Sequence, residues 1–170
     1  MSFKIIENFL EKEKFEKVKN IIVNKEFPWR LMSEDTEVQG GYFTHSLFYN
    51  CKVNSDYNCY ITNDIYEILK PAAIIQARVN LTFSSLFNNK PSKWHIDCDY
   101  GNYTSIFYLN NTEGGTEVKI NDKIHFIKAE ENKMLIMKGN VYHRGLLSPD
   151  VEKRYIINFN YFGEKNEFES

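Results

Sequence analysis

The sequence predicts a mainly β fold, a sandwich or barrel that is braced by α-helices from the N-terminal half. Strand-favouring aromatic residues are abundant, with 13 Phe and 11 Tyr among 170 residues. From residue 72 onward, short apolar segments follow one another at near-regular spacing, with turn residues between them. Both segments with helical features come before this point, so we expect helices to cover one sheet of the barrel.

The N-terminal half alternates strand-like and helical segments. Phe15, Val18, Ile21 and Ile22 recur at helical spacing within residues 11–25. A second, short helix is predicted to end before Pro71, which cannot continue it. We therefore predict, in order, a strand and turn over 3–10, a helix over 11–25, an extended segment over 27–32, a strand over 42–50 and a helix over 63–70.

The second half is predicted to consist of strands. They cover 73–83, 104–110, 116–120, 123–129, 133–139 and 154–162. Asn121-Asp122 predicts a two-residue hairpin, while Gly114-Gly115 and Gly139-Asn140 mark breaks. We expect one domain over 1–170, in which residues up to about 75 support a barrel core over about 76–162.

Composition narrows the function classes. The net charge of −2 gives no sign of bulk phosphate binding. The three cysteines form no CxxC pair and their number is odd, which favours a reducing, cytoplasmic location. No segment approaches the roughly 20 apolar residues of a membrane span, and the N-terminus does not resemble a signal peptide. We therefore expect no membrane association, and no pattern indicates an oligomeric state.

The segment His95-Ile96-Asp97 is a candidate half of a metal site. Residues two apart on a strand point to the same side, so His95 and Asp97 can bind one ion together. His143, expected in the loop after strand 133–139, is the best-placed third ligand. Two imidazoles and one carboxylate on one face of an ion suit non-haem Fe(II) oxygenases. Asp99 shares the strand parity of His95 and stays an alternative, although the pair two residues apart chelates more directly.

Two further residues are candidates for binding a carboxylate. Arg154 opens the last predicted strand, and an arginine is the natural bidentate partner of a carboxylate. Tyr108, on the strand after the histidine-aspartate pair, can add a hydrogen bond. Strand parity places Arg154 on the face that should look into the barrel, and the opposite, bulky face should pack against helices or core. A surface salt bridge and a core tyrosine are the alternative interpretations.

Taken together, "HID", "YLN", "GGTEV", His143 and "RYIINFNYF" resemble the iron(II)- and 2-oxoglutarate-dependent dioxygenases. The resemblance is closest to the prolyl 4-hydroxylase-like branch, including small oxygenases encoded by bacteriophages, and is firm over about residues 76–162. It implies a double-stranded β-helix, a jelly-roll barrel of two sheets. It also implies that Fe(II) is held by His95, Asp97 and His143.

The same resemblance implies how the cosubstrate is bound. Arg154 would pair with the distal carboxylate of 2-oxoglutarate, and Tyr108 would hydrogen-bond to that end. Asn80 lies on a strand where related enzymes often place a polar cosubstrate contact, with a buried structural asparagine as the alternative. No catalytic acid or base is implied beyond the metal ligands.

The implied reaction is hydroxylation of a substrate C–H bond with O₂, releasing succinate and CO₂ from 2-oxoglutarate, with ascorbate as an optional reductant. The substrate is expected to be a protein residue or a small molecule, and the net charge disfavours nucleic acid without settling the matter. A non-catalytic metal-binding or sensing jelly roll is the alternative function. Retention of Arg154 and Tyr108 argues against it, because cosubstrate-binding residues would have no use there. His45 and His125 are interpreted as structural.

Overall fold

The larger of two antiparallel sheets forms the body of the protein. The computed structural model describes residues 2–32, 42–83, 91–98, 100, 103–147 and 153–163. The larger sheet contains β1 (Phe3–Ile6), β2 (Arg30–Met32), β3 (Tyr42–Tyr49), β4 (Lys52–Val53), β5 (Ala73–Phe83), β6 (Tyr103–Tyr108), β9 (Lys133–Lys138) and β11 (Lys153–Phe162). Its order is β1-β9-β6-β11-β5-β3-β2, with β4 paired to β3. Strands from both halves of the sequence therefore share one sheet.

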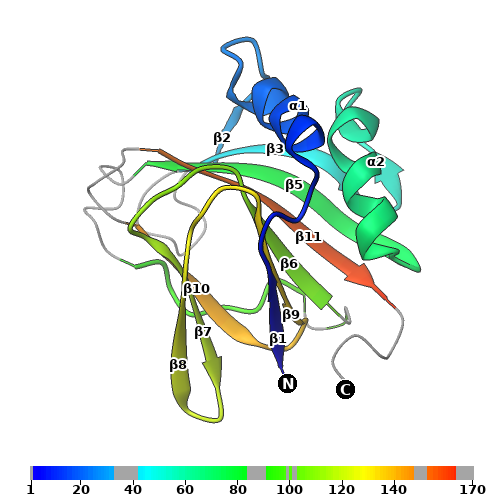
Figure 1. Cartoon of the computed structure of the whole chain (residues 1–170). Coiled ribbons are helices and arrows are strands. Elements are labelled where there is room, and N and C mark those ends of the chain that lie inside the picture. Colours follow the sequence, from blue (N-terminus) through cyan, green and yellow to red (C-terminus); the bar gives the residue numbers. More distant parts are fainter. Residues whose placement is uncertain are drawn as a thin grey trace.

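A smaller sheet faces part of the larger one. It contains β7 (Gly115–Ile120), β8 (Lys123–Lys128) and β10 (Tyr142–Leu146), in the order β10-β7-β8. Asn121 and Asp122 join β7 to β8 with positive φ angles of 48° and 61°, as a two-residue hairpin with a primed turn requires. Figure 1 shows this sheet on the side of the larger sheet that the helices leave uncovered.

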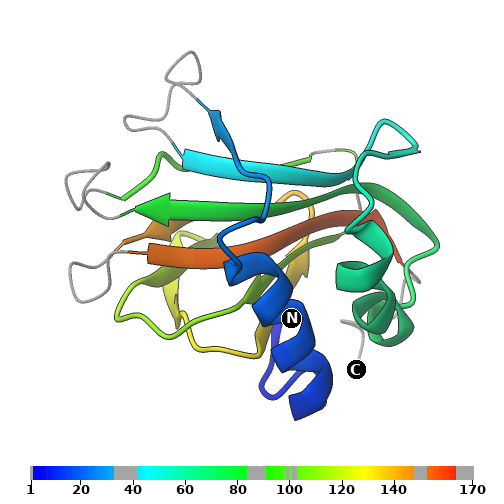
Figure 2. The same cartoon turned by 90° about the horizontal axis from the view of Figure 1, so that it is seen from above.

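Two helices cover the outer face of the larger sheet. They are α1 (Lys12–Val23) and α2 (Asn58–Leu69). Figure 2, seen from above, shows β3, β5 and β11 running side by side, with both helices running across the strand direction. Phe15, Val18 and Ile22 of α1 belong to the same buried core as Ile157 and Phe159 of β11, the face that strand parity predicted to pack against helices or core. No helix among the described residues is long and apolar enough to cross a membrane.

A second core lies between the sheets. It contains Ile106, Tyr108, Val118, Ile127, Ala129, Leu135, Met137, Val141 and Ile156. Because successive strand residues point to opposite faces, β11 contributes Ile157 and Phe159 to the helix side and Ile156 to this inner side. The same alternation directs the polar residues Arg154 and Asn158 inward.

Three elements differ from the sequence-based expectations, of which the short strand β4 was not predicted at all. The second helix begins at Asn58 rather than at residue 63, because its buried stripe of Ile61, Ile65 and Leu69 starts earlier. Residues 142–146, expected to form a loop, are strand β10, paired with β7 so that His143 lies opposite Val118. The pairing with β7 supplies backbone partners that the local sequence does not reveal.

Candidate metal centre

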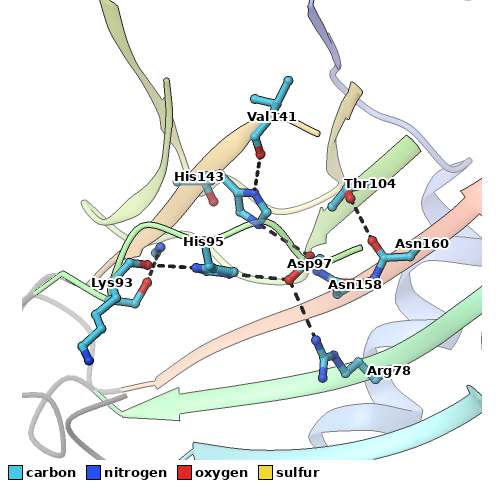
Figure 3. A network of polar contacts seen from close by, with 12 residues as sticks. Arg78, Lys93, His95, Asp97, Thr104, Val141, His143, Asn158 and Asn160 are labelled. Atoms are coloured by element: carbon cyan, nitrogen blue, oxygen red, sulfur yellow. Dashed lines mark hydrogen bonds and ion pairs between the residues drawn. The ribbon is translucent and has the colours of Figure 1, made fainter. Parts of the chain in front are cut away.

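Three side chains from two separate segments converge between the sheets. The ligand atoms of His95, Asp97 and His143 all lie within 4.8 Å of one another. Nε2 of His95 is 3.5 Å from Oδ1 of Asp97, and Nε2 of His143 is 3.5 Å from Oδ2. Figure 3 shows both imidazoles directed at the one carboxylate. Two imidazoles and a carboxylate form a donor set that suits Fe(II).

Strand parity is not what brings these residues together. His95 forms an isolated antiparallel bridge with His143, and Asp97 lies in a bend rather than in a strand. Cys98, the residue after Asp97, is buried. Asp99, the alternative to Asp97, lies outside the described residues.

Backbone carbonyl groups fix the orientation of both imidazoles. Nδ1 of His95 is 2.9 Å from the carbonyl oxygen of Lys93, and Nδ1 of His143 is 3.2 Å from that of Val141. A carbonyl oxygen only accepts, so each Nδ1 carries a hydrogen, and Nε2 is the nitrogen that each ring can offer to a metal ion. Two ring nitrogens and a carboxylate then face one another, an arrangement that a bound cation stabilises.

A chain of hydrogen bonds supports the Asp97 carboxylate from behind. Thr104 donates to Asn160 at 2.8 Å, Asn160 donates to Asn158 at 3.1 Å, and Asn158 donates to Oδ2 of Asp97 at 2.6 Å (Figure 3). Burial of Asp97 acts to raise its pKa, but contacts with His143 and His95 and the charge of Arg78 hold the pKa well below its usual value. Asp97 therefore stays ionised.

A cavity of about 390 Å³ opens beside this cluster and contains a second polar site. Arg154 lines it and is only 6% exposed. Among the described residues, no carboxylate forms an ion pair with its guanidinium, and its Nε has no hydrogen-bond partner. Burial lowers the pKa of Arg154, although a guanidinium remains charged in proteins. A buried cation without an anion is expensive, so this end of the cavity favours a carboxylate ligand.

Thr116 is the neighbour of Arg154 that sequence reasoning missed. Its Oγ1 accepts hydrogen bonds from the Tyr108 hydroxyl at 2.7 Å and from Nη2 of Arg154 at 3.1 Å. A hydroxyl has two lone pairs and one hydrogen, so Thr116 keeps its hydrogen for a ligand in the cavity. Tyr108 is fully buried and does not line the cavity. Burial raises its pKa against the opposing effects of Arg154 and Thr116.

Asn80 also lines the cavity, from the middle of β5. Its Oδ1 accepts a hydrogen bond from the Thr44 hydroxyl at 2.8 Å. The structure thus brings Asn80, Arg154 and the three candidate ligands to one cavity, with Tyr108 behind its wall. Their roles as iron and cosubstrate ligands stay predictions.

A cation–π contact between Arg144 and Trp94 connects the two segments that carry the histidines. Trp94 precedes His95, and Arg144 follows His143. The Arg144 guanidinium lies 4.5 Å from the centroid of the Trp94 ring, and its Nε forms an ion pair with Glu117 at 2.6 Å. This stacking links the two segments that supply the histidines. The sequence offered no signal for it beyond the position of Trp94.

Solved structures that share this fold include 2OG-Fe(II) oxygenases. A 2OG-Fe(II) oxygenase family oxidoreductase from Burkholderia pseudomallei matches with a TM-score of 0.72 at 7% identity, over 95% of this chain and 85% of its own. A Trichoplax adhaerens prolyl hydroxylase in complex with a hypoxia inducible factor peptide fragment matches with a TM-score of 0.72 at 18% identity, over 96% and 84%. The epimerase SnoN in complex with Fe³⁺, alpha ketoglutarate and nogalamycin RO matches with a TM-score of 0.65 at 10% identity, over 95% and 79%.

These likenesses establish the fold. The chain has the double-stranded β-helix of the 2OG-Fe(II) oxygenases, as expected from the sequence. No protein-family model matches the sequence, and no curated protein matches it. The His-Asp-His group adds a site that can hold a metal ion at the centre of this fold.

Proposed function

We propose that this chain is a single-domain Fe(II)- and 2-oxoglutarate-dependent dioxygenase that hydroxylates a C–H bond of a protein residue or small molecule. One observation supports this most directly. The convergent His95, Asp97 and His143 share a cavity with Arg154, a buried cation without a carboxylate partner among the described residues. A metal-binding protein without turnover has no need of that second feature.

Metal binding and cosubstrate binding would take place at opposite ends of the cavity. His95, Asp97 and His143 would hold Fe(II), and Arg154 with Thr116 would bind the distal carboxylate of 2-oxoglutarate. The iron, when bound, supplies the oxidative chemistry that converts 2-oxoglutarate and O₂ to succinate and CO₂ and hydroxylates the substrate.

The protein's own contribution is positioning. The Lys93 and Val141 carbonyl groups hold the imidazole tautomers, and Asn158 holds the carboxylate rotamer. Ile106 and Ile156 line the cavity between the two polar ends and keep the intervening wall apolar. No side chain is assigned as a general acid or base.

Anaerobic addition of Fe(II) and 2-oxoglutarate tests the proposal. A visible metal-to-ligand charge-transfer band should appear with the wild-type protein and disappear in Asp97→Ala and His143→Ala. His125→Ala is the matched control, because His125 lies on β8, outside the cavity, and is exposed. A normal band in both site variants would overturn the ligand assignment. A band without succinate release in air would instead indicate the non-catalytic, metal-binding function.

A further inference from the structure

Arg78 is a second guanidinium in the same cavity, and neither proposed ligand requires it. It lies on β5, lines the cavity, and its side chain is 26% exposed. Its one ion-pair contact among the described residues is to Oδ1 of Asp97, at 3.9 Å, and its Nε is buried without a hydrogen-bond partner. Figure 3 shows its guanidinium directed at the carboxylate that faces both histidines.

Asp97 does not explain the presence of this cation. A distance of 3.9 Å is too long for a hydrogen bond. The carboxylate already has closer partners in Asn158, at 2.6 Å, and in the two histidines, at 3.5 Å. A metal ion in the centre would further occupy the carboxylate. The donors of Arg78 are therefore available to another anion.

That anion is not the distal carboxylate assigned to Arg154. In the pairing of β5 with β11, Arg78 lies opposite Asn158, and Thr82 lies opposite Arg154. Four residues of strand, about 13 Å at about 3.3 Å per residue, separate these two rows. The two guanidinium groups therefore arise from different ends of the cavity floor, with Asn80 between them.

The charges in the cavity limit the kind of anion that Arg78 can bind. Fe(II) held by Asp97 keeps one positive charge, which the 2-oxo acid end of 2-oxoglutarate offsets, and the distal carboxylate offsets Arg154. Among the described residues that line the cavity, Asp97 is the only carboxylate, and the cations are Arg78, Arg154 and the exposed Lys93. Beside the metal centre, away from the exposed Lys93, one positive charge remains, that of Arg78, which matches a single carboxylate better than a phosphate dianion.

We propose that Arg78 binds a carboxylate of the primary substrate, which makes the substrate an organic acid or a chain with a free carboxylate beside the hydroxylated carbon. This inference rests on the proposed function. Since Arg78 lies 3.9 Å from a candidate iron ligand, carbon atoms near the bound carboxylate would face the metal. A cavity of about 390 Å³ is at the small end of ligand sites, which suits a small acid or one terminal residue.

Paramagnetic relaxation of acetate tests this without relying on turnover. The protein is loaded with Mn(II) and saturating 2-oxoglutarate, and the methyl-proton relaxation of added acetate is measured by NMR, with acetamide as the uncharged control and methyl phosphate as the dianion. Acetate should give a saturable enhancement, and acetamide and methyl phosphate a much smaller one. Arg78→Gln should weaken acetate binding at least tenfold, and Arg78→Lys should retain part of it. Arg30→Gln, which removes an exposed arginine outside the cavity, should change it little.

Three results would overturn the inference. They are equal enhancement by acetamide, unchanged acetate binding in Arg78→Gln, and loss of the acetate signal as 2-oxoglutarate is raised, which would place acetate in the cosubstrate site. The charge-transfer band with Fe(II) is recorded for the wild type and for every variant. A normal wild-type band without acetate binding refutes the role of Arg78 and leaves the proposed function standing. Acetate binding in the Mn(II)-loaded protein, when no charge-transfer band forms with Fe(II) and 2-oxoglutarate, refutes the proposed function and leaves carboxylate binding by Arg78 standing.

Discussion

His95 and His143 are joined through their backbones as well as through their shared carboxylate. The amide of each donates to the carbonyl oxygen of the other, and both hydrogen bonds measure 3.0 Å. Their rings lie 4.6 Å apart between centroids. Two residues that are far apart in the sequence are thus held as an antiparallel pair before any ion binds. The candidate metal centre is consequently preorganised by hydrogen bonds that metal removal would leave intact.

The support of Asp97 by Asn158 should be measurable as metal affinity. Asn158→Ala removes the 2.6 Å hydrogen bond to Oδ2, which frees the carboxylate to rotate. We expect roughly 10–100-fold weaker Mn(II) binding, as for other residues that orient metal ligands. Titration followed by electron paramagnetic resonance measures this. Asn54→Ala, at an exposed asparagine, is the control. Equal affinities for Asn158→Ala and wild type would show that Asp97 is held without this bond.

Arg154→Ala should weaken 2-oxoglutarate binding. Truncating one partner of a buried charge pair costs about 2–5 kcal/mol. The midpoint of the anaerobic charge-transfer titration should rise accordingly, while the exposed Arg30→Ala serves as a matched loss of one arginine. An unchanged midpoint would mean that another residue binds that carboxylate.

Thr116 and Tyr108 should differ in importance. Thr116→Val removes the hydroxyl that lines the cavity, so we expect a loss of about 1–3 kcal/mol in 2-oxoglutarate binding. Tyr108→Phe removes only the donor behind Thr116, and its effect should be smaller. The same titration compares both variants. A larger effect for Tyr108→Phe would indicate that the tyrosine hydroxyl contacts the cosubstrate directly.

Gly115 should be irreplaceable for steric reasons. A Cβ at this position would lie 2.0 Å from the backbone carbonyl oxygen of Ile127, and β7 cannot yield without breaking its pairing with β8. Gly115→Ala should lower the free energy of unfolding by about 1–3 kcal/mol or more. At Gly145 the nearest atom would be 3.5 Å away, an ordinary contact. Urea unfolding of Gly145→Ala should therefore stay close to wild type, and equal losses in the two variants would contradict this account.

Metal affinity should depend on pH through His95. Partial burial acts to lower the pKa of His95, but the Asp97 contact outweighs it and the pKa rises above its usual value. The metal-free protein therefore holds a proton on His95 that binding must displace, so affinity should fall as pH decreases, beginning above pH ~6.5. Mn(II) titrations between about pH 5 and 8, the range in which histidine titrates, measure this slope. In metal-free Asp97→Asn, the pKa of His95 followed by NMR should be lower than in the wild type, and an unchanged pKa would point to a different titrating group.

In metal-free protein, the same two groups have opposite effects on folding stability. The raised pKa of His95 stabilises the fold at low pH, and this contribution is lost as pH rises through that pKa. The lowered pKa of Asp97 stabilises the fold above its unfolded-state pKa, and this contribution is lost as acid protonates the carboxylate. The pair should therefore stabilise the metal-free fold most strongly in the weakly acidic range, where Asp97 is ionised and His95 is charged.

The sequence by itself determined most of the strands, the hairpin and the inward face of β11. These features depend on local chemistry: an 11-residue run over Ala73–Phe83 alternates between two faces, and Asn121-Asp122 tolerates the positive φ angles of a tight turn. The candidate ligands and Arg154 could also be predicted from the sequence, because few residue types can bind a metal or a carboxylate.

Only the tertiary structure decided how these residues meet. The strand character of β10 depends on a partner, β7, that lies elsewhere in the sequence, and local propensity gives no sign of it. Thr116 and Arg78 look like ordinary strand residues until pairing turns them toward one cavity. The bend that aims Asp97 at both histidines is likewise set by contacts with distant residues, Asn158 and His143. The sequence sets the chemical type of each residue, whereas pairing between distant segments brings those residues close enough together to form a site.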